Sequence, residues 1–359
     1  MTVHVEQLVE RYPVPPGWSA PARFEQTVRV GESSIELAGW SAVGPRDEPL
    51  TGSAAAADAA GSSAARGYFE LLERISVVDA MSGAEDLALL DREGRAIGRA
   101  ARADVFPESP CPERWRYARS NGVALHRSWR GACDRAAAEL VERDRVLRSW
   151  YGEIAPRRRA LPDASVPNGL RAHADWIACE LPARASAPGA ARALSVVVVA
   201  GIPRQASTPL VYGFGAGAGA RAAARAASEA VQRFGFLFGE DIPREPPRPS
   251  PTPDFHQEFF LYPPSHELFV AWLDGAPPNG ATPAPPAEDD RGLARDARPG
   301  LAARGAPAGI AFVDLTPRHL RGSLFVARAV CRAAEPLVFG EPAPHRARVS
   351  GDRRVHPIA

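Results

Sequence analysis

The chain has 359 residues, a formal net charge of +1 and 45% hydrophobic residues. A chain of this length can bury the core of one large domain or two ordinary ones, and its near-neutral charge argues against nucleic acid or an anionic membrane as the main partner. All of its basic side chains are arginines, because the sequence contains no lysine, and this excludes a lysine Schiff base and the lysine of a phosphate-binding P-loop.

The cysteines and the hydrophobic runs indicate in which cellular compartment we expect the protein. Four cysteines lie far apart, without a CxxC pair, at Cys111, Cys133, Cys179 and Cys331. This spacing excludes a clustered zinc site, and free thiols in a chain of this length fit a reducing environment. The first residues lack the basic-then-apolar order of a signal peptide, and the longest apolar run, at 194–202, is about half of what a membrane helix needs. We therefore expect a cytoplasmic protein that crosses no membrane.

The N-terminal half of the chain alternates short strands with helices. Residues 1–50 are broken by prolines and contain two strand-like runs, QTVRV and SIELAGW. The Ala/Ser/Gly-rich residues 51–66 lead into a helix around FELLERI, and residues 87–100 predict a hairpin about an Arg-Glu-Gly turn. The strongest pattern lies at 129–150, where apolar residues recur at helical spacing soon after an Asn-Gly turn signal.

The C-terminal half is richer in strands. We expect a helix near 169–181, the strands LSVVVVAGI and PLVYGFG, a helix at about 219–235, the helix SHELFVAWLDG, and the strands GIAFVDLT and SLFVARAV. The Pro-rich residues 241–253 and 276–309 predict irregular loops, the second of them flexible. Because strands and helices alternate irregularly, the sequence favours an α/β (α+β) domain with mixed sheets and packed helices over a doubly wound fold.

One acidic motif recurs in three of the predicted helices. It occurs as FELLERI with Glu70, Glu73 and Arg74, as AELVERD with Glu139, Glu142 and Arg143, and as ASEAVQR with Glu229, Gln232 and Arg233. Acidic side chains three residues apart share one helix face at about 6 Å, and a pair of carboxylates can hold Mg²⁺ together with nucleotide phosphates. Two interpretations remain open. Either the three helices converge on one polyanion and its metal ions, or each acidic face is solvated and pairs with its own arginine.

A glycine-rich segment, GFGAGAG at 213–219, precedes the third acidic helix. Backbone N–H groups at a helix N-terminus can bind phosphate. The segment lacks both the Lys-Ser/Thr pair of a P-loop and the GxGxxG fingerprint. It therefore predicts either a phosphate-binding loop or a plain strand-to-helix turn.

Taken together, these segments resemble the YcaO-like family, in particular the cyclodehydratases that form azoline rings in thiazole/oxazole-modified microcins and other ribosomally made peptides. The resemblance covers roughly residues 50–345 and keeps the order of the family's motifs. It rests on GYFELLER at 67–74, the Asn-Gly and Glu-x-x-Glu-Arg-Asp segments within 121–144, GFGAGAGARAAARAASEAVQ at 213–232, PDFHQEFFLYPP at 253–264, VDLT at 313–316, and Arg328 followed by Glu335-Pro336.

The resemblance implies a YcaO-like domain at 51–345, with an N-terminal segment at 1–50 and a tail at 346–359. It implies Mg²⁺ binding by Glu70, Glu73, Glu139 and Glu142, and ATP binding by Arg74, Arg127, Arg143, Glu229, Gln232 and Arg328. The implied chemistry is the activation of peptide amides. A Cys, Ser or Thr side chain attacks the preceding carbonyl, ATP phosphorylates the resulting oxygen, and loss of phosphate closes the azoline; thioamide or amidine formation on the same scaffold is also compatible.

Departures from the family pattern keep a second interpretation open. Arg130-Gly131-Ala132 stands where the family has Glu-Glu-Ala, so a carboxylate two turns before Glu139 is missing. The resemblance then leaves Arg127 and Arg130 as candidates for the phosphate site. The chain is either an ATP-dependent peptide-modifying enzyme or a degenerate, non-catalytic YcaO-like partner in a peptide-modification complex. The expected partners are a precursor peptide and a leader-peptide-binding protein, and a homodimer remains open.

Overall fold

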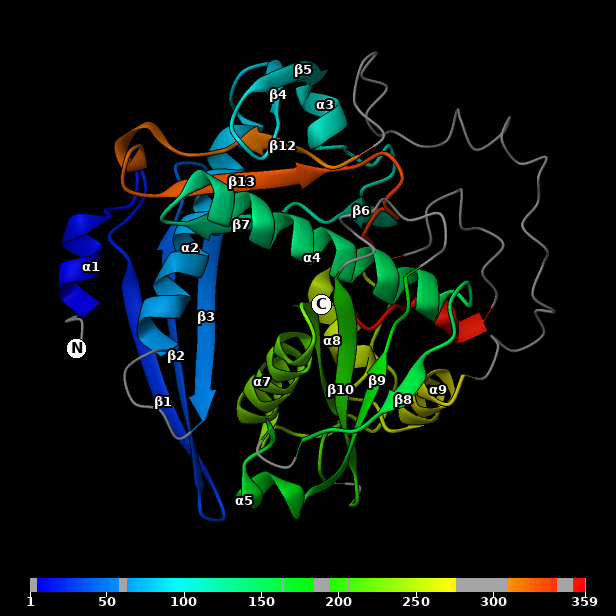
Figure 1. Cartoon of the computed structure of the whole chain (residues 1–359). Coiled ribbons are helices and arrows are strands. Elements are labelled where there is room, and N and C mark those ends of the chain that lie inside the picture. The colour runs from blue at the N-terminus through cyan, green and yellow to red at the C-terminus, as the bar shows by residue number, and fades with distance from the viewer. Residues whose placement is uncertain are drawn as a thin grey trace, which may run out of the picture.

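A long central helix, α4 (Trp129–Trp150), crosses the computed structural model between its sheets (Figure 1). The structure describes residues 5–57, 63–162, 165–183, 194–205, 207–275, 309–340 and 351–358. Ser128 caps α4, because its side chain accepts a hydrogen bond from the Gly131 N–H at 3.2 Å. The predicted helix at 129–150 is therefore confirmed. None of the helices in the described ranges is both long and apolar enough to cross a bilayer.

Four sheets surround α4 in the described residues, and their strand pairs are antiparallel. The first sheet has the order β1-β2-β3, with β1 (Ala22–Val30), β2 (Ser33–Val43) and β3 (Pro49–Ala57). The second has the order β5-β4-β12-β13-β7, with β4 (Asp86–Leu90), β5 (Ala96–Ala101), β7 (Val123–His126), β12 (Ala311–Asp314) and β13 (Phe325–Val330). The third has the order β11-β10-β9-β8, with β8 (Arg157–Arg159), β9 (Ala174–Glu180), β10 (Ser195–Pro203) and β11 (Val211–Gly217). The fourth pairs β14 (Val338–Gly340) with β6 (Trp115–Tyr117).

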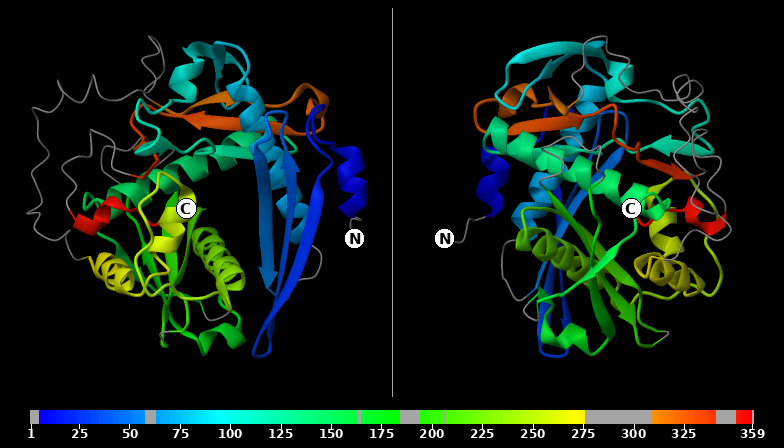
Figure 2. Two further views of the ribbon diagram at one scale, coloured as in Figure 1. Left: turned by 180° about the vertical axis from the view of Figure 1, so that it is seen from behind. Right: turned by 45° about the vertical axis from the view of Figure 1, so that its right-hand side comes forward.

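The other helices pack on these sheets. They are α1 (Val5–Arg11), α2 (Ser63–Met81), α3 (Arg102–Val105), α5 (Asn168–Arg171), α7 (Ala220–Leu237), α8 (Pro253–Phe259) and α9 (Pro264–Leu273), with 3₁₀ turns at Arg318–Leu320 and Gly351–Arg354. The views in Figures 1 and 2 agree that α7 lies between the β1–β3 sheet and the β8–β11 sheet. Helix α2 packs on the other face of β2 and β3. The α+β architecture expected from the sequence is confirmed.

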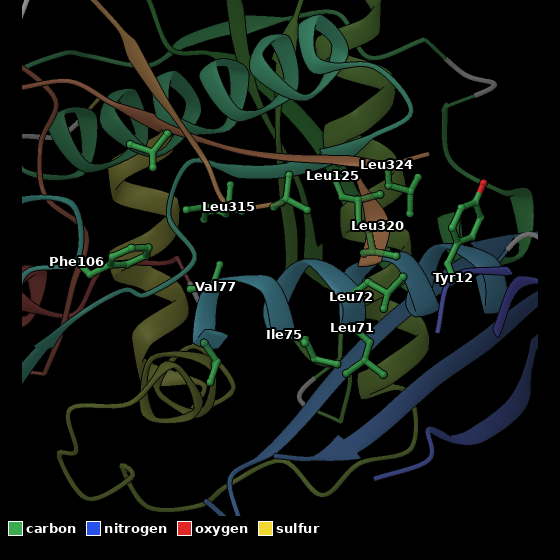
Figure 3. Packing of buried hydrophobic residues seen from close by; sticks show 14 of the residues in the cluster. Tyr12, Leu71, Leu72, Ile75, Val77, Phe106, Leu125, Leu315, Leu320 and Leu324 are labelled. Atoms are coloured by element: carbon green, nitrogen blue, oxygen red, sulfur yellow. The ribbon is translucent and has the colours of Figure 1, made fainter. Parts of the chain in front are cut away.

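Two apolar cores hold the layers together. The first joins α2 to the five-stranded sheet, where Leu71, Leu72 and Ile75 meet Leu125 and Leu315 (Figure 3). The second lies beneath the C-terminal half of α4 and is rich in aromatic rings packed edge to face, among them Trp150, Trp272, Phe260 and Tyr212. Helix α4 contributes to the second core and to a smaller cluster against β7 and β13, so the cores fix its position relative to three sheets.

Two elements differ from the sequence-based expectation because tertiary packing outweighs local pattern. Residues 49–57, for which the sequence analysis named no element, form strand β3. Their small side chains let α2 approach closely: a Cβ at Gly52 would overlap the backbone of Leu71. The predicted helix at 169–181 is wrong. It is replaced by the short helix α5 and strand β9, whose central place between β10 and β8 suits Trp176 and Ile177.

Most of the glycine-rich segment is strand, followed by a short strand-to-helix turn, which agrees with the second of the two alternatives left open by the sequence. Residues 211–217 form strand β11, and α7 begins directly after it at Ala220. A Cβ at Gly213 or Gly215 would overlap the backbone of α7, so these glycines allow a close contact between strand and helix. The flexible loop predicted at 276–309 lies outside the described residues, apart from its last position.

Candidate functional site

Helices α2, α4 and α7 bring five glutamates together, which we call the glutamate cluster: Glu70, Glu73, Glu139, Glu142 and Glu229. Each of them accepts a hydrogen bond from a backbone N–H outside its own helix. The donors are Ser53 to Glu70 at 3.1 Å, Leu125 to Glu73 at 2.8 Å, Gly122 to Glu139 at 3.4 Å, Phe214 to Glu229 at 3.1 Å, and Ala216 to Glu142. All five carboxylates are therefore oriented by backbone donors from strands β3, β7 and β11 and from the turn before β7.

The electrostatics of the cluster show that its members lie close together. Burial raises the pKa of all five carboxyl groups. Repulsion between helices adds to this, because Glu139 raises the pKa of Glu73, and Glu229 raises the pKa of Glu139 and Glu142. The pKa of Glu139 reaches about 7 and that of Glu142 about 8. Of the two interpretations left open by the sequence, the structure favours convergence over three separate solvated faces.

Arg143 lies among these carboxylates. Burial alone would lower its pKa, but the attraction of Glu139, Glu142 and Glu229 raises it overall. Its Nε lies 4.0 Å from Glu142 Oε1, an ion pair without a hydrogen bond. The Glu142 side chain is 12% exposed and that of Arg143 is 20% exposed, so both can be reached from solvent.

Two further arginines flank the cluster. Arg328, on β13, is 6% exposed; burial lowers its pKa to about 10, while Glu139 opposes that change. Its guanidinium donates to the Arg119 carbonyl and lies 4.6 Å from the centre of the Phe106 ring. Arg74 forms an ion pair with Glu70 at 2.7 Å, one turn apart on α2. Arg233, on α7, also attracts Glu229, so four arginines lie near the five carboxyl groups.

The hydrogen-bond donors and the carboxylates of the cluster fit a nucleotide with Mg²⁺. Within the described residues, the Nε–H groups of Arg143 and Arg328 are buried donors without a hydrogen-bond partner, and phosphate oxygens are the acceptors that guanidinium groups prefer. No three His, Cys, Asp or Glu side chains in the described ranges are placed to hold one ion. Mg²⁺ usually takes only one or two carboxylates beside phosphates and waters. The residues therefore suit a metal–phosphate complex and not an all-protein metal cage.

The structure places most, but not all, of the predicted site residues at this cluster. It brings together Glu70, Glu73, Arg74, Glu139, Glu142, Arg143, Glu229 and Arg328. Gln232 follows Glu229 by three residues on α7, which places both on one face of that helix. Arg127 is exposed in the loop before α4, about 15 Å along the helix axis from the level of Glu139.

The structure places Gly131, where the family pattern has a glutamate, away from the middle of α4. It lies in the first turn of α4, where the imidazole of His126 occupies the space into which a side chain at position 131 would point. Its neighbours Trp129 and Arg130 contact the β4–β5 turn, at Asp91 and Glu93. A glutamate side chain at this position would require His126 to move. That the missing carboxylate weakens the acidic site stays a prediction.

Three residues near the cluster have contacts or burial that the sequence analysis did not predict. Asn121, from the Asn-Gly segment on which the resemblance partly rests, has a buried Oδ1 without a hydrogen-bond partner among the described residues. Asp144 Oδ1 accepts from Arg148 Nε and from the Glu335 N–H, both at 2.7 Å, and so ties the segment after β13 to α4. His356 is fully buried, and Arg143 is among the groups that lower its pKa after burial itself.

The sequence also matches a family profile. Residues 99–332, roughly two thirds of the chain, match the family described as YcaO cyclodehydratase, ATP- and Mg²⁺-binding. The chain belongs to the YcaO family. No curated protein matches it.

Solved structures share this YcaO fold at low sequence identity. YcaO from Methanopyrus kandleri, bound with AMPPCP and Mg²⁺, is 15% identical with a TM-score of 0.56, over 93% of this chain and 91% of that one. A heterocyclase in complex with substrate and cofactor is 16% identical with a TM-score of 0.52, over 93% of this chain and 52% of that one. The E. coli microcin synthetase McbBCD complex with pro-MccB17 bound is 12% identical with a TM-score of 0.52, over 87% of each chain.

Proposed function

We propose that this YcaO protein uses ATP and Mg²⁺ to activate backbone amides of a ribosomally made peptide, closing azoline rings from Cys, Ser or Thr. The observation that carries the proposal is the glutamate cluster: carboxylates from three helices, partly accessible to solvent, with unpartnered guanidinium donors among them. Phosphoryl transfer depends on positioning and on charge neutralisation, which this set of groups provides. Because the chain has no lysine, arginines are its strongly basic side chains available to the phosphates.

Different side chains of the cluster would bind the metal ion and the phosphates. Pairs of carboxylates within the cluster would hold Mg²⁺, and Arg143 and Arg328 would present their free Nε–H groups to phosphate oxygens. ATP with Mg²⁺ would supply the phosphoryl group that turns the former amide oxygen into a leaving group. The backbone N–H donors on β3, β7 and β11 keep the carboxylates in place while their charge is taken up by the metal.

We also propose that the chain needs a separate protein to capture its precursor peptide. The described sheets and helices all pack into the layers around α4, and none forms a further compact unit for leader binding. The microcin synthetase that shares the fold is itself a complex of several proteins. Tight binding of a leader peptide by the isolated chain would contradict this part of the proposal.

Calorimetric titration with Mg²⁺ and a non-hydrolysable ATP analogue tests the nucleotide site. Wild type should bind, and Glu142→Ala should abolish binding, because it removes a carboxylate beside Arg143. Asp134→Ala is the matched control: it removes a carboxylate from the same helix, but one that is 51% exposed and paired with Arg92. If wild type binds no nucleotide at millimolar concentration, the enzyme proposal fails, and a non-catalytic role in a peptide-modification complex replaces it.

A further inference from the structure

The elements that the structure describes cover one face of the β1–β3 sheet over only part of its length. Directly opposite residues of antiparallel strands share a face, so the register defines rows across the sheet. The rows Val28–Ile35–Ala57 and Gln26–Leu37–Ala55 meet α7, where Gly235 lies against Ile35 and Leu37. The next rows on the same face are Phe24–Gly39–Ser53, Ala22–Ser41–Thr51 and Val43–Pro49. We call these three the open rows.

The open rows carry exposed apolar side chains. Phe24 is 43% exposed and Val43 is 42% exposed, and they are two of the four large hydrophobic residues exposed in the described part of the chain. The outer edge of the Phe24 ring lies over Gly39, whose lack of a side chain makes room for it, and a large part of the ring stays exposed. Most of the other side chains in the open rows are small or carry a hydroxyl group, as in the adjoining row of Ala22, Ser41 and Thr51.

The open rows begin at the glutamate cluster. Ser53, at the β3 end of the first open row, donates its backbone N–H to Glu70 at 3.1 Å. In Figure 1, β3 lies beside α2, with α7 at the level of its C-terminal end and α4 crossing above. The first open row therefore ends at a residue whose backbone binds Glu70, one of the carboxylates that we assign to Mg²⁺ and ATP.

We propose that the open rows bind the substrate polypeptide, which lies across them in an extended form with an apolar side chain on Phe24. This inference rests on the proposed function, which puts the reacting amide at the cluster. Neighbouring strands are about 4.8 Å apart, so Phe24 lies roughly 10 Å across the sheet from Ser53, a distance that about three extended residues span. The enzyme should then prefer an apolar residue about three positions from the reacting Cys, Ser or Thr.

Two synthetic hexapeptides test this preference. They are identical except that one carries Leu, and the other Asn, three positions from its single Cys, and each is titrated into protein loaded with Mg²⁺ and a non-hydrolysable ATP analogue. Wild type should bind the Leu peptide at least tenfold more tightly, as expected for burial of a large apolar side chain. Phe24→Ser should remove this difference and leave nucleotide affinity unchanged. Ile97→Ser, which changes another exposed apolar side chain on the distant strand β5, should alter neither.

Several results would overturn the inference. As long as nucleotide binding persists, the inference fails if wild type binds the two peptides with equal affinity or binds neither. It also fails if the preference for the Leu peptide survives Phe24→Ser. A wild-type dimer that Phe24→Ser dissociates in sedimentation would show that a second copy covers the open rows. Loss of nucleotide binding by wild type would defeat the proposed function instead. Should Phe24→Ser fail to fold, Phe24→Thr, which puts a polar β-branched residue suited to a strand at the same position, makes the same comparison.

Discussion

Replacing Glu139 by Gln should stabilise the nucleotide-free protein at alkaline pH while weakening its binding of Mg²⁺ and nucleotide. Burial raises the pKa of Glu139 from 4.5 to about 7. The folded protein therefore holds this proton more tightly than the unfolded chain, and a penalty for ionising the group appears as the pH rises from about 4.5 through 7. The difference corresponds to at most ~3 kcal/mol, since the side chain keeps some exposure. A neutral amide avoids this penalty.

Thermal unfolding of wild type and Glu139→Gln across this pH range measures the effect. For a chain of this length, ~3 kcal/mol corresponds to a rise of about 4 °C above pH 8, and the difference should vanish below about pH 4.5. Asp134→Asn, which neutralises an exposed carboxylate on the same helix, should show no comparable dependence on pH. A Glu139→Gln protein that is less stable than wild type at pH 9, or whose difference does not change with pH, would refute the electrostatic argument.

Three further predictions follow from contacts in and around the site. Gly213→Ala should lower the free energy of unfolding by about 1–3 kcal/mol, because the added methyl group overlaps the backbone of Ala226 in α7. Asp144→Ala should lower it by about 2 kcal/mol, since Arg148 loses one carboxylate partner and the Glu335 N–H loses its acceptor. Affinity for Mg²⁺ with nucleotide should rise with pH between about 6 and 8, because raised carboxyl pKa values mean that protons must leave before the cation binds.

Each of these three predictions can be tested by a single measurement. Thermal unfolding of Gly213→Ala is compared with Gly309→Ala, where a Cβ meets no atom within 4 Å, and equal effects would contradict the packing argument. An Asp144→Ala protein as stable as wild type would show that the link between α4 and the segment after β13 contributes little. Calorimetry in buffers of different ionisation enthalpy counts the protons released on Mg²⁺ binding, and none released at pH 7 would contradict the third prediction.

The sequence predicted those elements whose signal is local. Helix α4 was placed at its observed bounds, because apolar residues recur along its whole length and Ser128 caps it. Strand β3 was not predicted and β9 was predicted as helix, because the identity of both segments depends on neighbours far away in the sequence. Small residues in β3 look like loop sequence, but α2 requires them for its close approach at Gly52. Periodicity within a single segment cannot show such a contact.

The same distinction between local and tertiary information applies to the residues of the candidate site. Two carboxylates three residues apart on one helix are visible in the sequence, and Glu70 with Glu73 or Glu139 with Glu142 could be named from spacing. Which helix meets which is tertiary information: the repulsion between Glu73 and Glu139 exists only because α2 and α4 pack together. The backbone donors from the strands were equally invisible, since any residue can supply an N–H.

The arginines explain how a chain without lysine can hold so many buried carboxylates. A guanidinium stays charged where an ammonium would lose its proton, and its planar fork can contact several oxygens at once. Arg143 uses this property toward Glu139, Glu142 and Glu229, yet its Nε–H has no hydrogen-bond acceptor among the described residues. A cation bound by the same carboxylates would take over part of that compensation and leave the guanidinium to a phosphate. One arginine can thus stabilise the cluster before nucleotide binds and contact the nucleotide afterwards, which follows from its position among acidic side chains of two helices.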